Sequence, residues 1–253
     1  MLFYIVTMLL AVDIGNTYTK FGVFENGDLL AKFAVETDTD DLVGAVDGRL
    51  DGHPDAAVVC SVVPEAAERV GRLFKHGFKI QPTWVDSGSD FGLDIKHRPR
   101  VSMGADRLVN SFAAAEKYGP PVLVLSFGTA TTIDLVNEKR GLVGGLIAPG
   151  MSLMAKSLRE HTAKLPEVDA KRPKNLLGAS TEDAIRSGIY LSAVGLVETA
   201  VDRIHREFGD MRVVATGGFA KEIAAATDRI EIVDEDLTLY GLANLAGRLN
   251  GKK

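Results

Sequence analysis

The hydrophobic residues of this chain form two long runs, and each run ends in a short turn of small and polar residues. The first run and its turn occupy residues 9–20, and the second occupy residues 122–133. A continuous run of Val and Leu is typical of a strand buried on both faces of a sheet. After each turn come a second apolar strand (21–24 and 133–136), a polar hairpin tip and a third apolar run. The pattern therefore predicts the same β-hairpin unit twice, as in a duplicated half-domain.

Both turns carry groups that bind anions. Each begins with a glycine, Gly15 or Gly128, which has no Cβ to keep a ligand from the backbone. Residues 129–132 then offer consecutive backbone N–H groups and three Thr hydroxyls, and residues 16–20 offer Asn, Thr and Lys donors. One such turn is ordinary hairpin chemistry, but two in register favour a phosphate site in each half. Neither turn is a Walker loop or a Gly-x-Gly-x-x-Gly dinucleotide fingerprint.

The rest of the chain alternates between helical and extended patterns. We expect a short helix in 37–46, an amphipathic helix that starts at Pro64 and stops at Gly77, a helix from Ala105 to the Gly-Pro-Pro at 119–121, and a long apolar helix through 184–204. Strands are expected at 58–63 and 79–85. The apolar stretch 1–12 is too short to span a bilayer and is interpreted as an extended first strand. These elements predict an α/β fold.

Composition and charge narrow the class of protein. The chain has 253 residues, a net charge of −5 and a pI of about 5.6, which argues against nucleic acid as a partner. Its single cysteine, Cys60, cannot form an internal disulfide, so a reducing cytoplasm is expected, with no membrane partner. The five histidines have no metal-ligand spacing with Cys60.

Asp106 is an acidic residue whose position allows a catalytic role, because it lies at a predicted helix start just after Gly104. A helix N-terminus favours an anion, and Gly104 permits a ligand to come close. One interpretation of Asp106 is a first-turn acid that stabilises the helix dipole. The other is a general base beside a phosphate site. The residues alone leave both interpretations open.

Seven motifs occur in the order and spacing of the type III pantothenate kinases, and the chain resembles that family over almost its whole length. The motifs are Asp13-Ile-Gly-Asn-Thr17, Gly104-Ala-Asp-Arg107, Phe127-Gly-Thr-Ala-Thr-Thr132, Gly144-Gly-Leu-Ile-Ala-Pro-Gly150, Thr162-Ala-Lys-Leu-Pro166, Gly178-Ala-Ser-Thr181 and Thr216-Gly-Gly218. The resemblance implies two tandem ribonuclease-H-like halves of the actin and sugar-kinase type, with mixed sheets and flanking helices. The halves would be residues 1–117 and 118–253, with the active site in the cleft between them.

The resemblance also implies an activity, the transfer of the γ-phosphoryl group of ATP to the primary hydroxyl of pantothenate, the first step towards coenzyme A. It implies Mg²⁺, held by Asp13 directly or through water, a bound K⁺ or NH₄⁺, and a homodimer. The catalytic residue would be Asp106, as proton acceptor. The residues that resemble the ATP-binding segments are Asp13, Ile14, Gly15, Asn16, Thr17, Tyr18, Thr19, Lys20, Gly128 and Thr129, with Gly217 and Gly218 nearby. Those that resemble the pantothenate-binding segments are Gly104, Ala105, Asp106, Arg107, Thr181 and Lys96.

Two positions depart from the family pattern. Ser126 stands where the family has an Asp associated with the monovalent cation, and Ser126 also aligns with Asp13 of the first half. Lys96 stands where many members have a Tyr that lines the pantothenate pocket, so Lys96 either meets the pantothenate carboxylate or marks a changed substrate. These departures leave two alternatives, a non-catalytic homologue that binds nucleotide or a pantothenate-like ligand in a regulatory role, and a sugar or acetate kinase on the same fold.

Overall fold

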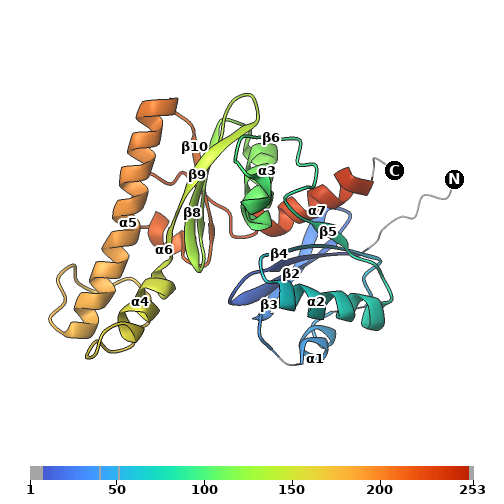
Figure 1. The fold of residues 1–253 in the computed structure, drawn as a ribbon, viewed down its shortest axis with the longest axis horizontal. Coiled ribbons are helices and arrows are strands. Elements are labelled where there is room, and N and C mark those ends of the chain that lie inside the picture. The colour runs from blue at the N-terminus through green and yellow to red at the C-terminus, as the bar shows by residue number, and fades with distance from the viewer. Residues whose placement is uncertain (1–7, 40, 51, 251–253) are drawn as a thin grey trace. The chain divides into compact units, whose positions relative to one another are not determined.

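The protein is described by a computed structural model that covers residues 8–39, 41–50 and 52–250. The chain forms two compact units (Figure 1). The first unit contains residues up to Lys117 together with those from Asp236 onward, and the second contains Tyr118–Glu235. The first unit thus takes in the last helix, which a division of the chain at 117 and 118 leaves to the second half. The apolar stretch 1–12 lies outside the described residues up to position 7, and from Leu9 it is a strand.

Among its described residues, the first unit holds six strands and four α-helices, with two short helical turns. Its elements in chain order are β1 (Leu9–Ile14), β2 (Tyr18–Glu25), β3 (Asp28–Glu36), α1 (Leu42–Asp47), β4 (Ala56–Ser61), α2 (Pro64–Arg72), the π-helical η1 (Leu73–Phe78), β5 (Thr83–Val85), β6 (Asp94–Ile95), the 3₁₀-helical η2 (Arg100–Ser102), α3 (Ala105–Tyr118) and α7 (Leu237–Asn250).

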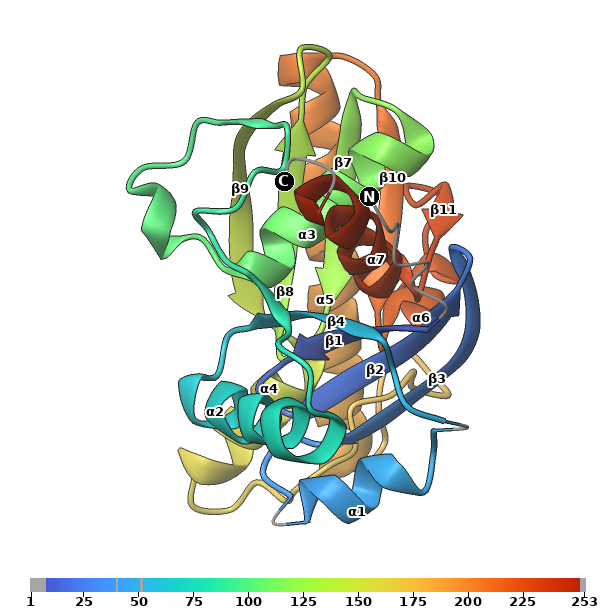
Figure 2. The ribbon, with the colours of Figure 1, turned by 90° about the vertical axis from the view of Figure 1, so that its right-hand side faces the viewer.

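Five of these strands form a mixed sheet in the order β3-β2-β1-β4-β5. β1 is antiparallel to β2 and parallel to β4, and β5 continues in parallel beyond β4. Apolar residues of α1 and α2 pack with the sheet in one buried core, and α7 packs against β1, β4 and β2. Figures 1 and 2 show α1 and α2 on one face of this sheet and α7 on the other.

The second unit repeats this plan. Its elements are β7 (Val122–Phe127), β8 (Ala130–Val136), β9 (Gly141–Pro149), α4 (Met151–Glu160), α5 (Thr181–Phe208), β10 (Arg212–Gly217), α6 (Ala220–Ala224) and β11 (Ile232–Val233). The strands of this unit lie in the order β9-β8-β7-β10-β11. β7 is antiparallel to β8 and parallel to β10, and β11 is parallel to β10. Strand order and directions match those of the first sheet, which confirms the predicted duplication.

The helix predicted to stop at Gly77 continues past it. The chain stays helical to Phe78, and Lys79 ends the helix in a left-handed conformation with φ 58°. Phe74 and Phe78 are both buried in the first core, so packing holds the backbone helical across the glycine. A glycine inside a helix costs only about 1 kcal/mol, which such packing exceeds. The strand predicted at 79–85 is correspondingly short, and only β5 is extended.

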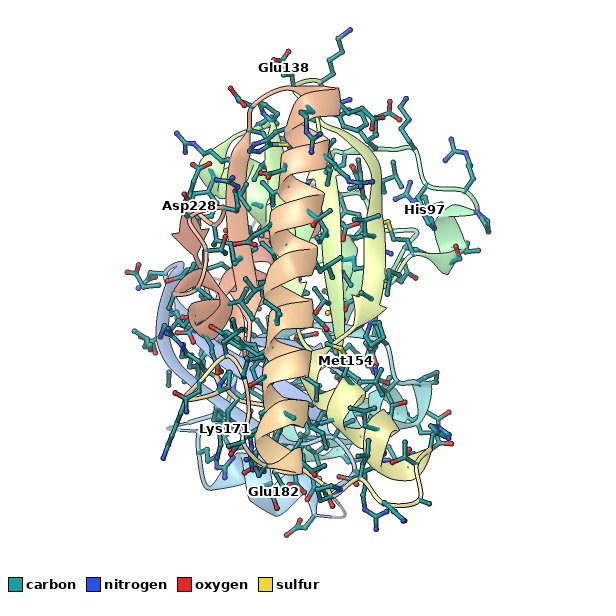
Figure 3. All side chains as sticks on the ribbon, turned by 90° about the vertical axis from the view of Figure 1, so that its left-hand side faces the viewer. His97, Glu138, Met154, Lys171, Glu182 and Asp228 are labelled. Atoms are coloured by element: carbon teal, nitrogen blue, oxygen red, sulfur yellow. The ribbon has the colours of Figure 1, made fainter. Side chains whose placement is uncertain are left out.

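The longest helix, α5, lies along one face of the second sheet (Figures 1 and 3). Its buried residues, such as Ile189, Val197 and Val201, join the core of the second unit with the strands. By length and composition α5 could cross a membrane, but half of its most apolar window is buried inside its own unit. The core helix of a globular domain has this same composition.

Candidate active site

The first strand of each sheet ends at a candidate phosphate turn, and in the first unit Asp13 stands at this end. Asp13 is the second-to-last residue of β1, and its register partner on the parallel strand β4 is Cys60. Burial raises the pKa of the Cys60 thiol, so the thiol is protonated. It donates a hydrogen bond to Oδ1 of Asp13 over 3.4 Å. The Asp13 carboxylate is therefore held at the carboxyl ends of two parallel strands, where ligands of open α/β sheets bind.

Asp106 belongs to the same part of the first unit. The backbone N–H of Val62, which follows β4, donates to the carbonyl of Ile14 at the end of β1 (3.1 Å). A Cβ placed on Gly104 would lie 3.7 Å from Cγ1 of Val62 and only 2.5 Å from Oδ1 of Asp106. The start of α3 thus approaches the ends of β1 and β4, and the Asp106 carboxylate lies close over Gly104. Any side chain at position 104 would occupy the space of that carboxylate.

Both carboxylates have a raised pKa, and the charge of Asp106 acts on that of Asp13. Burial raises the pKa of Asp13 to about 6, while the positive charge of Lys20 lowers it and the negative charge of Asp106 raises it. Burial also raises the pKa of Asp106, against the opposing effects of the backbone N–H and the charge of Arg107. Two neighbouring acids whose pKa values are raised by burial are typical of sites that bind cations or move protons.

The turn between β1 and β2 presents its polar side chains outward. The N–H of Gly15 donates to the carbonyl of Tyr18 (3.1 Å), which closes the turn. Asn16, Thr17 and Tyr18 are exposed, whereas Thr19 is buried in β2. Ile14 is likewise fully buried in β1. Asn16 and Thr17 line a hollow of about 450 Å³ that is completed by Glu36, Thr37, Asp38, Val63, Glu65 and Arg69.

The equivalent turn of the second unit is shorter and is packed by glycines. The N–H of Gly128 donates to the carbonyl of Ala130 (3.0 Å), and the N–H of Gly150 donates to that of Thr129 (3.0 Å). A Cβ on Gly150 would lie 2.2 Å from the Gly128 carbonyl oxygen, and one on Gly217 would lie 2.4 Å from that of Phe127. Gly217 also has φ 93°, which other residues rarely adopt. One glycine from each of two sequence motifs therefore packs closely against this turn or the strand end before it.

Only part of the donor set predicted for the second turn is available. Gly128 and Thr129 are exposed, but Thr131 and Thr132 are buried in β8 and pair with Phe127 and Ser126 of β7. Their backbones pair within a three-stranded ladder, and little of their side chains is exposed. A role of their hydroxyls in binding phosphate stays a prediction. The turn itself contributes Gly128, Thr129 and the edge of Ala130.

Ser126 is half-buried near the end of β7. Its register partners are Thr216 on the parallel strand β10 and Thr132 on the antiparallel strand β8. Register partners point to the same face of a sheet, so the three hydroxyl residues form a row across neighbouring strands. Within the part of the chain that the structure describes, no three His, Cys, Asp or Glu side chains are placed to share a metal ion. A serine between two threonines offers neutral oxygens where a carboxylate would offer charge.

The other candidate substrate residues have different surroundings. Arg107 is buried in α3 with 8% of its surface exposed. Lys96 is about half exposed and forms an ion pair with Asp94. Thr181 is the first residue of α5, where Ser180 caps the helix by accepting from the N–H of Asp183 (3.1 Å).

Thr181 lines an open, mainly apolar groove of about 770 Å³ between α4 and α5. Its walls include Pro149, Leu153, Met154 and Ile189, and Figure 3 shows Met154 beside α5. Pro149 directly precedes Gly150, which packs on the second turn. In the second unit, the groove and the turn are thus neighbours.

The structure connects Thr37, which no sequence motif marks as a site residue, to the first turn. The Thr37 hydroxyl donates to the carbonyl of Gly15 (2.7 Å), and its N–H donates to the carbonyl of Thr17 (3.0 Å). Thr37 follows β3, 22 positions after Gly15. The register of the hairpin that joins β2 and β3 was the only signal that could have brought the two residues together.

Comparison with known proteins identifies relatives of this chain. The family model described as "Type III pantothenate kinase" matches residues 9–203. The protein named "Type III pantothenate kinase" from Rhodospirillum rubrum is 42% identical over 247 residues, covering 93% of this chain and 96% of that protein.

Solved structures show the fold. A structure described as a conserved putative Baf family transcriptional activator from Campylobacter jejuni has a TM-score of 0.61 at 19% identity, covering 96% of this chain and 99% of that one. The ROK hexokinase of Thermus thermophilus has a TM-score of 0.51 at 13% identity, covering 97% and 100%. The two units therefore have the fold of the sugar-kinase and actin class, as the sequence predicts. Because the family model covers most of the chain and the identity extends over nearly its full length, the chain belongs to the type III pantothenate kinase family.

Proposed function

We propose that the protein transfers the γ-phosphoryl group of ATP to the primary hydroxyl of pantothenate and forms 4′-phosphopantothenate, the first step of coenzyme A biosynthesis. Family membership supports the reaction and the substrate. The observation that carries the proposal within the structure is the meeting of Asp13 and Asp106 at the carboxyl ends of β1 and β4 and the start of α3. Phosphoryl transfer needs a phosphate site and a proton acceptor side by side.

Asp106 is the proton acceptor in this proposal. It lies at the start of α3, where backbone N–H groups also favour an anion. The substrate hydroxyl is a far weaker acid than any carboxyl group, so Asp106 takes the proton late, as the new P–O bond forms. Its raised pKa makes it a better acceptor than an exposed aspartate. The electron pair of the hydroxyl oxygen attacks the γ-phosphorus, and the bond to the ADP oxygen breaks.

Each of the two turns is assigned a role in binding phosphate. In the first unit the exposed turn Gly15–Tyr18 supplies donors, and Lys20, whose charge reaches Asp13, offsets phosphate charge. We propose a phosphate-binding role also for Gly128 and Thr129, which follow the equivalent strand, β7, of the second unit. The buried Ile14 and Thr19 act through the backbone only, because their side chains are enclosed.

Asp13 is the residue that fits Mg²⁺. Protein sites for Mg²⁺ commonly use one or two carboxylates together with substrate phosphates and water, so the single carboxylate of Asp13 is sufficient. When bound with ATP, Mg²⁺ neutralises charge on the phosphates. Cys60 fixes the orientation of the carboxylate that would hold it.

The residues Gly104–Arg107, Thr181 and Lys96 are assigned to pantothenate. Gly104 gives the substrate access to the helix start beside Asp106. Lys96 already has a carboxylate partner in Asp94, and it is about half exposed. An exposed ion pair exchanges partners at little cost, so Lys96 can turn to the carboxylate of pantothenate.

The residues around position 126 do not suit a monovalent cation. The row of Ser126, Thr132 and Thr216 lacks the charge that a carboxylate would supply to K⁺ or NH₄⁺. We therefore propose that turnover does not depend on a monovalent cation, and no step of the reaction is assigned to one.

We further propose a homodimer in the cytoplasm. The groove between α4 and α5 is apolar and open, and Leu153 and Leu191 beside it are 40% and 54% exposed. Exposed apolar surface of this kind on two neighbouring helices is typical of a subunit interface. The free thiol of Cys60 agrees with a reducing compartment.

Incubation of the purified protein with ATP, Mg²⁺ and pantothenate, followed by mass spectrometry, tests the function. Formation of 4′-phosphopantothenate and ADP in equal amounts is expected. Binding of nucleotide and pantothenate without product would instead assign the chain to a non-catalytic role.

A further inference from the structure

One buried residue, Thr37, holds the first phosphate turn in place by hydrogen bonds from its side chain and its backbone. Thr37, 7% exposed, sits just after β3 and reaches the turn twice. Its hydroxyl donates to the carbonyl of Gly15 over 2.7 Å, and its N–H donates to the carbonyl of Thr17 over 3.0 Å. Both ends of the exposed segment that includes Asn16 are therefore tied to a single residue.

The hydroxyl hydrogen bonds form a directed chain. Oγ1 of Thr19 and Oγ1 of Thr37 are 3.2 Å apart, and Thr19 is 1% exposed. Since Thr37 uses its only hydroxyl proton on Gly15, Thr19 must donate to Thr37. Removing the Thr37 hydroxyl would leave the Thr19 proton and the Gly15 carbonyl without their partner in a buried place, which is costly.

Arg69 of α2 completes the arrangement from the other side. Its guanidinium donates to the carbonyl of Thr37, and Arg69 lines the same hollow as Asn16 and Thr17. A charged donor makes a stronger hydrogen bond than a neutral one. The position of the turn is thus linked through Thr37 to a helix that packs on the sheet.

We propose that Thr37, braced by Arg69, is a positioning residue that holds the Gly15–Tyr18 turn in the conformation that binds the ATP phosphates. The inference rests on the proposed function, because it assigns the turn to ATP. Thr37 touches neither substrate. It acts by fixing the turn before the nucleotide arrives, so that binding does not have to order it.

Four variants test this proposal by their dissociation constants for a non-hydrolysable ATP analogue with Mg²⁺ and by the KM values of both substrates. Thr37→Val keeps the branched shape and removes the hydroxyl, and Thr37→Ser restores it. Arg69→Met removes the brace from a partly exposed position and serves if Thr37→Val does not fold. Thr39→Val makes the same chemical change two residues further along, outside the hydrogen-bond chain.

We expect Thr37→Val to raise the dissociation constant and the KM for ATP about tenfold, the effect of one buried hydrogen bond with an orphaned partner, and to leave the KM for pantothenate within about twofold. Thr37→Ser should return the ATP values to within about threefold of wild type, Arg69→Met should raise them by about threefold, and Thr39→Val should not change them.

Wild-type nucleotide affinity in both Thr37→Val and Arg69→Met would overturn the proposal, as would a parallel rise in both KM values. If the wild-type protein binds the analogue but forms no phosphopantothenate, the proposed substrate is wrong, while the dissociation constants still decide the role of Thr37. Failure of the wild-type protein to bind the analogue would contradict both proposals.

Discussion

Asp13 and Asp106 have the same side chain but different surroundings, and these surroundings separate their roles. Asp13 stands between two strands, receives the thiol of Cys60 and feels the charge of Lys20. Asp106 lies at a helix start, where backbone N–H groups oppose the effect of burial on its pKa. The first environment suits a carboxylate that holds a cation, and the second suits one that accepts a proton from a nearby alcohol.

Replacement of Asp106 by Asn should remove the proton acceptor and keep the shape. We expect kcat to fall by at least about a hundredfold, the usual contribution of a general base, with nucleotide affinity within about threefold of wild type. Steady-state kinetics and titration with an ATP analogue measure the two effects. A variant that turns over at the wild-type rate would remove Asp106 from the mechanism.

Replacement of Asp13 by Asn should change the stability of the folded protein by an amount that depends on pH. The pKa of Asp13 is raised to about 6 in the folded protein, so between about pH 4 and pH 6 the folded state keeps a proton that the unfolded chain releases. Stability from this group is therefore lost as the pH rises through that window. The Tm of Asp13→Asn relative to wild type should be higher at about pH 7.5 than at about pH 5, without nucleotide. An equal difference at both pH values would contradict the raised pKa.

The serine at position 126 leads to a prediction about the effect of monovalent cations on kcat. Addition of K⁺ or NH₄⁺, compared with a bulky organic cation at the same ionic strength, should change kcat by less than about twofold, because the row of hydroxyls carries no charge. Ser126→Asp should gain a dependence on K⁺ that the wild type lacks. Strong stimulation of the wild type by K⁺ would show that neutral oxygens suffice for the cation.

At the scale of elements, continuous apolar runs and glycine placement predicted the two hairpins. The helical spacing of apolar residues predicted the helix from Ala105. Both are local features of the sequence. The helix past Gly77 and the burial of Thr131 and Thr132 could not be read from the sequence, since tertiary packing and strand register decide them. The hydrogen bonds of Thr37 to the first turn could not be predicted either, because they also depend on strand register. The partners of Thr37 are distant in sequence and become neighbours only when β3 pairs with β2.

The exposed face of α5 leads to a prediction on assembly. Leu191→Lys places a charge on a leucine that is 54% exposed beside the apolar groove, and it should convert the proposed dimer to monomers in multi-angle light scattering. Leu30→Lys is the matched control, because Leu30 of β3 is 59% exposed in the first unit. If the Leu191→Lys variant remains a dimer, or if the wild-type protein is a monomer, this face is not the interface.

At the scale of the whole molecule, duplication of one sheet plan explains why the strand-and-turn motif occurs twice. Asp13 and Ser126 occupy equivalent places before the two turns, and only one of them has kept a carboxylate. The sequence was sufficient to predict the α/β halves, and the family resemblance supplied the substrate. No physical pattern in the residues could have named pantothenate, because the fold accepts many acceptors.

Transfer of labelled γ-phosphate from ATP to competing acceptors tests the proposed phosphorylation of pantothenate most directly. With pantothenate, glucose and acetate offered in parallel, the wild-type protein should label pantothenate and leave the other two at background, and Asp106→Asn should label none. Preferential labelling of glucose or acetate, or no labelling of pantothenate by a protein that binds ATP, would contradict the proposed function.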